Sequence, residues 1–120
     1  MTMKESGEMY LETILILEKR NGTVRSVDIA HEMNFSKAAI SRAMTRLKND
    51  EYVSFDDEGF VKLTAKGKKI ATKIYERHNV LSEFLMGLGV KEKTAIEDAC
   101  KIEHDISDET FKAIKKTLKK

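Results

Sequence analysis

The chain has 120 residues, of which 41% are hydrophobic and 35% charged, so it is long enough for one compact domain or two small ones but too short for an elaborate enzyme scaffold. No apolar run approaches membrane-spanning length and the first twenty residues do not read as a secretory signal, so we expect a cytoplasmic protein with no membrane partner. A single cysteine excludes an intramolecular disulfide, and a net charge of +2 excludes a strongly basic nucleic-acid coat while permitting a local basic face.

The first predicted elements are two helices separated by a short turn. Residues 4–20 carry leucine and isoleucine at helical spacing, and the pair Asn21-Gly22 that follows is a C-terminal stop signal. Ser26 is predicted to cap a second, shorter helix whose apolar positions continue to Met33.

A third helix and a hairpin follow. Ser36 is placed to cap a helix that runs through Asn49, and two short helices with so tight a connection are typical of a helix-turn-helix. Two stretches rich in β-branched and aromatic residues, 52–55 and 60–63, flank an acidic turn at residues 56–59, which predicts a β-hairpin. Helix, helix and hairpin in this order predict a winged helix.

The rest of the chain is predicted to be helical. Thr64 is placed to cap a long helix that ends at Gly87 or Gly89. Its apolar residues recur at the spacing of a helix seam, and they are Ile70, Ile74, Leu81, Leu85 and Leu88. A fifth helix is expected over residues 92–106, and Ser107 is placed to cap a sixth.

The predicted third helix divides into an apolar and a polar face. Advancing about 100° per residue places Ile40, Ala43, Met44 and Leu47 in one arc, which we expect to face the core. The opposite arc combines cations for phosphates, an arginine able to grip guanine, and small side chains for close approach to base edges. A solvated helix face would look the same in isolation, but the preceding turn and the following hairpin favour a recognition helix. The candidate DNA-contacting residues are Ser36, Lys37, Ala38, Ser41, Arg42 and Thr45, with Arg25 and Arg46 as further candidates for phosphate contacts.

A possible set of metal ligands lies in the predicted fifth helix. Cys100, Glu103 and His104 occur at i, i+3 and i+4, which places a thiolate, a carboxylate and an imidazole on one helical face. A buried cysteine beside a surface Glu-His pair would give the same spacing. A metal bound there needs a further ligand, and Met9 could supply a thioether, although a methionine near a chain start also serves as core filler.

Segments spread over nearly the whole chain resemble the diphtheria-toxin-repressor family of metal-dependent regulators, which includes a manganese-regulator branch. These segments are residues 8–12 (EMYLE), 28–30 (DIA), 66–71 (KGKKIA), 77–78 (RH) and 98–104 (DACKIEH). Their order and spacing make the resemblance specific.

The resemblance implies a fold that is mainly α with a small β-hairpin. A winged helix-turn-helix DNA-binding domain is expected at residues 1–72, followed by an all-α dimerisation and metal-binding domain at residues 73–120. In this family divalent metal bound between the domains activates operator binding. The chain is expected to be a short form, without the C-terminal SH3-like domain of the iron branch.

The resemblance also assigns metal ligands by position. The residues that match the activating site of the iron branch are Met9, Cys100, Glu103 and His104. Glu12 and His78 match ligands to the second metal of the manganese branch, where Glu103 would be shared.

Two positions depart from the family patterns. Ser82 stands where both branches carry a carboxylate, and Ile96 replaces the histidine of the iron branch's additional site. His78 also falls on the apolar register of the long helix, so a packed interface histidine is the alternative to a ligand.

Methionine and cysteine are softer donors than the carboxylates that manganese regulators use at matching positions, which disfavours manganese. We therefore expect Fe2+, with Mn2+, Co2+, Ni2+ and Zn2+ as alternatives. The expected protein is a homodimeric, metal-activated repressor of metal-homeostasis genes that binds double-stranded operator DNA and is not an enzyme. The alternatives are a winged-helix repressor that responds to a small organic ligand, and a metal-dependent hydrolase, for which the sequence supplies neither a pocket-forming loop nor a separate base.

Overall fold

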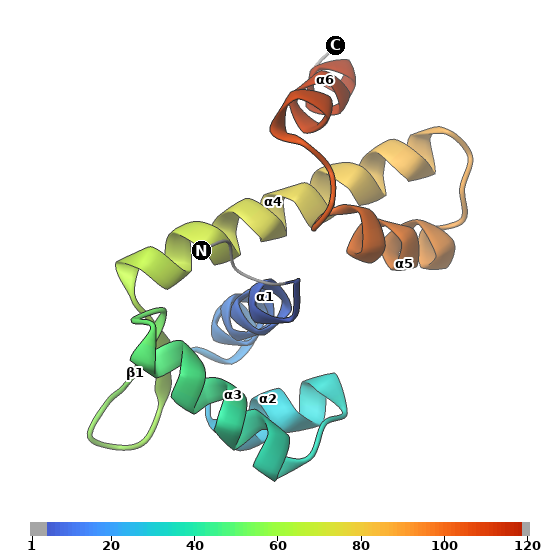
Figure 1. Cartoon of the computed structure of the whole chain (residues 1–120). Coiled ribbons are helices and arrows are strands. Elements are labelled where there is room, and N and C mark those ends of the chain that lie inside the picture. The colour runs from blue at the N-terminus through green and yellow to red at the C-terminus, as the bar shows by residue number, and fades with distance from the viewer. Residues whose placement is uncertain (1–4, 119–120) are drawn as a thin grey trace. The chain divides into compact units, whose positions relative to one another are not determined.

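The computed structural model describes residues 5–118, and it is mainly α with one two-stranded hairpin, as predicted (Figure 1). The elements are α1 (Glu5–Asn21), α2 (Ser26–Met33), α3 (Lys37–Asn49), β1 (Val53–Phe55), β2 (Val61–Leu63), α4 (Ala65–Gly87), α5 (Glu92–Ile102) and α6 (Asp108–Leu118). The chain divides into two compact units between Thr72 and Lys73, so α4 begins in the first unit and continues into the second. The expected start of the first helix at Lys4 lies outside the described residues.

Hydrophobic burial holds the first unit together. Its largest fully buried side chains are all apolar and come from both strands and from each helix or its flanking turn: Leu11, Ile14, Val24, Ile29, Ile40, Met44, Val53 and Val61. Burying one such side chain contributes about 1.5–3 kcal/mol. The helix-turn-helix and the hairpin therefore share one core.

The connection between α2 and α3 is a tight turn. Asn34 adopts a left-handed conformation (φ +57°), which asparagine tolerates better than most residues, and the Phe35 N–H donates to the Ala30 carbonyl at 3.0 Å. Ser36 caps α3 as predicted, because its Oγ accepts the Ala39 N–H at 3.1 Å. The two helices are thereby fixed as a helix-turn-helix.

The predicted cap of the second helix is wrong. Ser26 is the first residue of α2, and Arg25 takes the capping position before it. The Asp28 carboxylate accepts the Arg25 backbone N–H at 2.9 Å, so the side chain of an acid in the first turn bonds back to the capping residue.

The turn of the hairpin is stabilised by the side chain of Asp56. β1 and β2 pair antiparallel with Val53 opposite Leu63, and the Asp56 carboxylate accepts the backbone N–H groups of Glu58 and Phe60, each at 2.9 Å. The Val61 N–H donates to the Val24 carbonyl at 2.7 Å, which ties β2 to the segment before α2.

The first turn of α4 packs closely against the base of the hairpin. The Thr64 hydroxyl donates to the Glu51 carbonyl at 2.6 Å and accepts the Gly67 N–H at 3.1 Å, so Thr64 caps α4 as predicted. A Cβ added at Gly67 would lie 2.0 Å from the Tyr52 carbonyl oxygen. Only glycine allows this approach.

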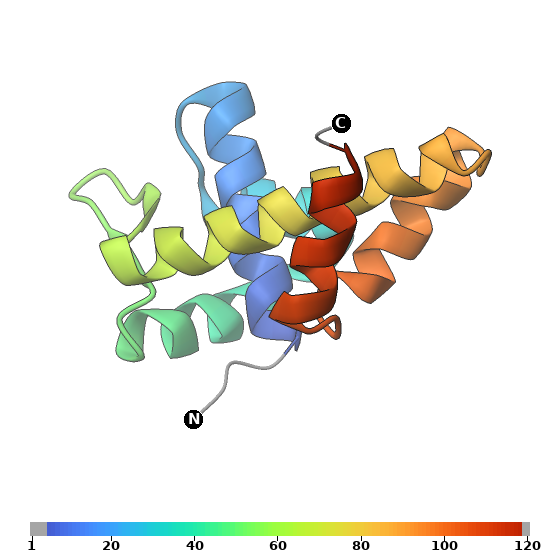
Figure 2. The same cartoon turned by 90° about the horizontal axis from the view of Figure 1, so that it is seen from above.

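In the second unit, α5 folds back along the C-terminal part of α4, as both views show (Figures 1 and 2). The apolar side chains buried in this unit are Ile74, Leu81, Ala95, Ala99 and Phe111. Leu88 does not belong to the seam, because α4 ends at Gly87 and Leu88 is 67% exposed. No helix among the described residues has the length and apolarity needed to cross a bilayer.

The fifth helix ends earlier than its sequence predicts. Regular α-helix stops at Ile102 rather than residue 106, and the Asp105 N–H turns back to the Ile102 carbonyl at 3.0 Å. Ser107 then caps α6 as predicted, accepting the Thr110 N–H at 3.1 Å. Cys100 therefore lies in the last turn of α5, whereas Glu103 and His104 lie in the turn that follows it.

Candidate metal centre and DNA-binding surface

The two faces predicted for α3 are present. Ile40, Met44 and Leu47 are buried, and the residues predicted to meet DNA are exposed. These exposed residues are Ser36, Lys37, Ala38, Ser41, Arg42, Thr45 and Arg46. The arrangement leaves a basic and hydroxyl-rich helix face open, while its contact with DNA stays a prediction.

Arg25 has a structural role that the sequence did not indicate. Its guanidinium donates to the Glu58 carbonyl at 3.3 Å and lies 4.2 Å from the centre of the Phe60 ring. Arg25 therefore connects the start of α2 to the hairpin, and a contact with phosphate would be additional to this role.

A group of three metal-binding side chains comes together in the second unit. His78 on α4, Cys100 on α5 and Glu103 after α5 each present a donor atom, and these atoms all lie within 4.8 Å of one another. The His78 Nδ1 lies 3.9 Å from the Cys100 Sγ and 3.5 Å from a Glu103 carboxylate oxygen. Metal bonds of about 2.0–2.3 Å in tetrahedral geometry imply donor separations of about 3.4–3.6 Å. A small adjustment would bring the three donors onto one transition-metal ion.

The Glu103 carboxylate gives an independent reason to expect a cation. Its side chain is fully buried, and within the described part of the chain neither of its oxygens accepts a hydrogen bond. A buried carboxylate is costly unless a charged partner compensates it; the protonated His78 imidazole, 3.5 Å away, does so without metal, and a bound divalent ion would take over this role. The residues present therefore fit a bound divalent metal.

His78 carries an altered proton affinity. The neighbouring Cys100 thiol, and then the Glu103 carboxylate, raise the pKa of the His78 imidazole to about 10, while partial burial acts in the opposite direction. Its ring side chain is only 18% exposed. Of the two alternatives considered for His78, its immediate polar neighbours favour a ligand over a packed apolar histidine.

The remaining predicted ligands, His104, Met9 and Glu12, are not part of this three-residue group. His104 follows Glu103 directly, and its Nε2 lies 3.8 Å from a Glu103 carboxylate oxygen. Met9 and Glu12 belong to α1 in the first unit, where Met9 is 38% exposed and Glu12 is buried. The sequence spacing grouped Cys100 with His104, whereas the structure groups Cys100 with His78.

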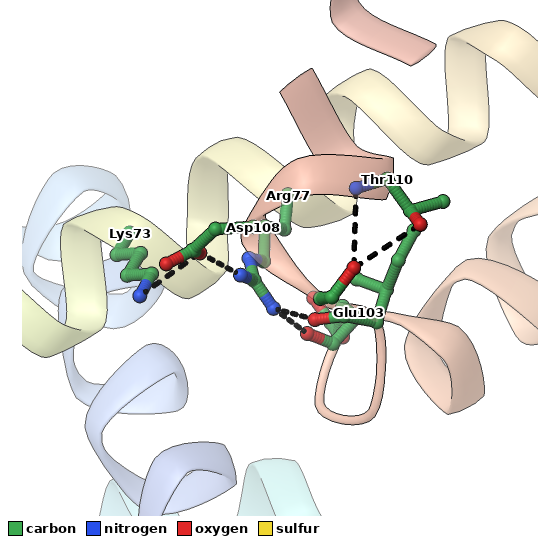
Figure 3. A network of polar contacts seen from close by, with 7 residues as sticks. Lys73, Arg77, Glu103, Asp108 and Thr110 are labelled. Atoms are coloured by element: carbon green, nitrogen blue, oxygen red, sulfur yellow. Dashed lines mark hydrogen bonds and ion pairs between the residues drawn. The ribbon is translucent and has the colours of Figure 1, made fainter. Parts of the chain in front are cut away.

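An arginine next to His78 was missed by the sequence reasoning. The Arg77 guanidinium donates to the Glu103 carbonyl at 3.1 Å, to the Ile106 carbonyl at 2.8 Å, and to the Asp108 carboxylate (Figure 3). Lys73 also contacts that carboxylate, at 3.3 Å. A signal was available, because Arg77 occupies the apolar spacing of the long helix, where a charged residue needs a buried partner.

The fold and the centre define a class: a winged helix-turn-helix DNA-binding protein with a candidate transition-metal site in its second unit. The family model described as iron dependent repressor, N-terminal DNA binding domain, matches residues 2–61. The model described as iron dependent repressor, metal binding and dimerisation domain, matches residues 64–120. The chain therefore belongs to the iron-dependent repressor family of metal-dependent, DNA-binding transcription repressors, which confirms the resemblance.

Individual relatives agree with this family. An uncharacterized HTH-type transcriptional regulator of Methanocaldococcus jannaschii is 35% identical over 120 residues, covering 98% of this chain and 96% of that protein. The HTH-type transcriptional regulator MntR of Geobacillus thermodenitrificans is 35% identical over 102 residues, covering 85% of this chain and 72% of that protein. The solved structure of the manganese regulator SloR matches with a TM-score of 0.82 and 30% identity over 99% of this chain. This chain spans 55% of the SloR chain.

Proposed function

We propose that this protein is a homodimeric repressor whose affinity for operator DNA rises when a divalent transition metal binds at His78, Cys100 and Glu103. The observation that carries the proposal is the convergence of an imidazole, a thiol and a fully buried carboxylate within 4.8 Å. The genes controlled would be those of metal homeostasis, since the metal itself is the signal. Such a regulator acts in the cytoplasm, where its operators are.

Ferrous iron is the metal we propose. MntR and SloR are named as manganese regulators, but this chain offers the thiolate of Cys100, and a soft donor disfavours manganese relative to iron, cobalt, nickel or zinc. Intrinsic affinity would rank nickel and zinc above iron, so the supply of metal in the cell decides among them.

In this proposal, the effect of metal binding on the recognition helix depends on the following residues. Bound metal would supply the positive charge that the buried Glu103 carboxylate calls for. His78 would give up its ring proton to become a ligand. Met9, Glu12 and His104 are the further ligands that the family resemblance assigns. Because α1 contacts α2, which contacts α3, recruitment of Met9 and Glu12 on α1 would steady the recognition helix.

DNA recognition in this proposal uses the exposed face of α3. Lys37 and Arg46 would neutralise phosphates, and Arg42 would read a guanine. Two copies related by a twofold axis would present two such helices to a palindrome whose half-sites lie about one helical turn or a multiple apart.

The proposal is tested by measuring operator affinity across a metal series. Duplexes selected from a random pool by the iron-loaded protein serve as operators, and affinity is then measured with chelator, Fe2+, Mn2+, Co2+ and Zn2+ at fixed salt. We expect metal to tighten binding by about tenfold or more. His78→Ala and Cys100→Ala should lose this activation, whereas His31→Ala, which removes an exposed histidine on α2, should keep it.

Two results would contradict the proposed metal activation or the proposed ligands. If the chelator-treated protein binds its operator as tightly as the iron-loaded protein, metal activation is wrong. A winged-helix repressor controlled by a small organic ligand would then remain. If Met9→Ala loses activation and His78→Ala does not, the functional ligands are the iron-branch set alone.

A further inference from the structure

Arg77 connects the helix that carries His78 to the turn that carries Glu103. It lies directly before His78 on α4, and its side chain is only 7% exposed. A guanidinium remains charged at any pH a protein survives, so its burial is tolerated only where acceptors surround it. The positions of those acceptors therefore indicate what Arg77 holds.

The acceptors that bind the Arg77 guanidinium lie in the connection between α5 and α6 and at the start of α6. The Glu103 carbonyl is just past the end of α5, the Ile106 carbonyl is in the connection, and the Asp108 carboxylate is in the first turn of α6 (Figure 3). The guanidinium also lies 5.4 Å from the centre of the Phe111 ring. A carbonyl at a helix end has no partner within the helix, and Arg77 satisfies that of Glu103 at the end of α5.

The contacts of Arg77 position a proposed metal ligand, Glu103, as well as the connection between α5 and α6. Glu103 gives its backbone carbonyl to Arg77 and presents its carboxylate 3.5 Å from the His78 Nδ1. Arg77 and His78 are adjacent in sequence, so one point on α4 determines both the backbone position of Glu103 and the place of the imidazole it faces. Cys100, by contrast, lies within regular α5 and needs no such support.

We infer that Arg77 is a positioning residue for the metal centre: it holds Glu103 at the distance from His78 that a shared ion requires. The inference rests on the proposed metal-binding function and names a further residue on which that function depends. Lys73 cannot replace Arg77, because Lys73 is 57% exposed and its ion pair is with Asp108 rather than with the Glu103 carbonyl. A lysine at position 77 would keep the charge but not the forked geometry that reaches several acceptors at once.

The test is a titration of the reduced, metal-free full chain with Co2+, followed by optical absorption. A thiolate-to-cobalt charge-transfer band reports Cys100, and the ligand-field bands report the number and type of the remaining donors. Arg77→Gln should weaken Co2+ binding by about 10-fold or more and change the ligand-field bands, while the thiolate band persists at saturation. Lys73→Ala, the matched control, should stay within about twofold of wild type.

A second measurement separates positioning from a general loss of stability. Arg77→Lys should weaken Co2+ binding in the wild-type background but by less than about twofold when Glu103→Gln is already present, because the ligand it positions is gone. A residue that acts only through stability would cost the same in both backgrounds. This comparison of Arg77→Lys in the two backgrounds also tests the positioning role if Arg77→Gln does not fold.

A wrong metal centre and a wrong positioning role for Arg77 would give different results. If the wild-type chain gives no thiolate band with Co2+, the proposed metal centre is wrong and the role of Arg77 falls with it. If the wild type gives the band, and folded Arg77 variants match its affinity and its ligand-field spectrum, only the positioning role is wrong.

Discussion

The first unit fills its core with leucine, isoleucine, valine and methionine, whereas the second places a guanidinium and a carboxylate among its most buried side chains. Among the residues that the structure describes, Arg77, Ser82 and Glu103 are the buried polar residues of the second unit, and Glu12, a proposed ligand, is the buried polar residue of the first. Apolar burial stabilises a fold without regard to solution conditions near neutral pH. Buried charges do so only while their partners are present.

This difference between the two cores indicates that the two units have different functions. A unit that presents a recognition helix needs a fixed shape, which an apolar core provides through close packing. A unit that senses metal needs a centre whose energy changes on metal binding, and in the proposed function the buried Glu103 carboxylate beside His78 would supply it. Apart from the proposed ligands Met9 and Glu12, substitutions in the first unit should therefore act on folding or on DNA binding, and those around His78 and Glu103 in the second unit on responses to pH and metal.

The largest expected effect is a failure of packing in the first unit. Gly67→Ala places a methyl group 2.0 Å from the Tyr52 carbonyl oxygen, and because backbone must move to admit it, we expect a loss of about 3 kcal/mol in the free energy of unfolding. Urea denaturation followed by circular dichroism measures it. Gly87→Ala, at the other end of the same helix, meets no described atom within 4 Å and should leave stability nearly unchanged. Equal effects of the two substitutions would contradict the close contact at Gly67.

A smaller effect, confined to DNA recognition, is expected on the exposed face of α3. Arg42→Ala should reduce the preference for the selected operator over a random duplex by about 1–3 kcal/mol, because it removes the bidentate contact with guanine that we propose for Arg42. Competition binding at constant salt measures this preference. Arg20→Ala, which removes an exposed arginine paired with Glu32 at 3.0 Å, is the control and should preserve it. An equal loss of affinity for operator and random DNA in Arg42→Ala would make Arg42 a phosphate contact instead.

The smallest effect is a pH dependence in the second unit. Lys73, and then Arg77, hold the pKa of the Asp108 carboxyl below its ordinary value, so folding favours the ionised form. The resulting stabilisation is present above about pH 4, where the unfolded carboxyl is ionised, and disappears as the pH falls through the lowered pKa. Because Asp108 is exposed, we expect the effect to be small.

Asp108→Asn tests this dependence. Its urea midpoint should lie below that of the wild type near neutral pH, and the two midpoints should converge in acid. Asp105→Asn, an exposed carboxylate in the same connection, serves as the control. A difference between Asp108→Asn and the wild type that stays constant down to pH 3 would contradict the ion pairs with Lys73 and Arg77.

Much of the fold was predictable because its signals are local. Ser36, Thr64 and Ser107 cap helices where the sequence places them, since a cap involves only residues two or three positions away. The hairpin and the apolar face of α3 follow likewise from short-range periodicity. The predicted cap at Ser26 failed because α2 begins one residue earlier than expected, with Arg25 at the capping position and its backbone N–H bound by the Asp28 carboxylate.

The amino-acid sequence determined the helices, the winged-helix order, the family and the residue types able to bind a metal, because each depends on neighbours along the chain. Tertiary structure alone decided that Cys100 meets His78, that Glu103 is fully buried, and that α5 stops at Ile102. The approach of Cys100 to His78 depends on α4 lying against α5, which brings together residues more than twenty positions apart in sequence. Spacing within one helix does not identify such a contact: a charged residue at the apolar spacing of α4 signals that Arg77 needs a buried partner, but only the structure identifies its acceptors.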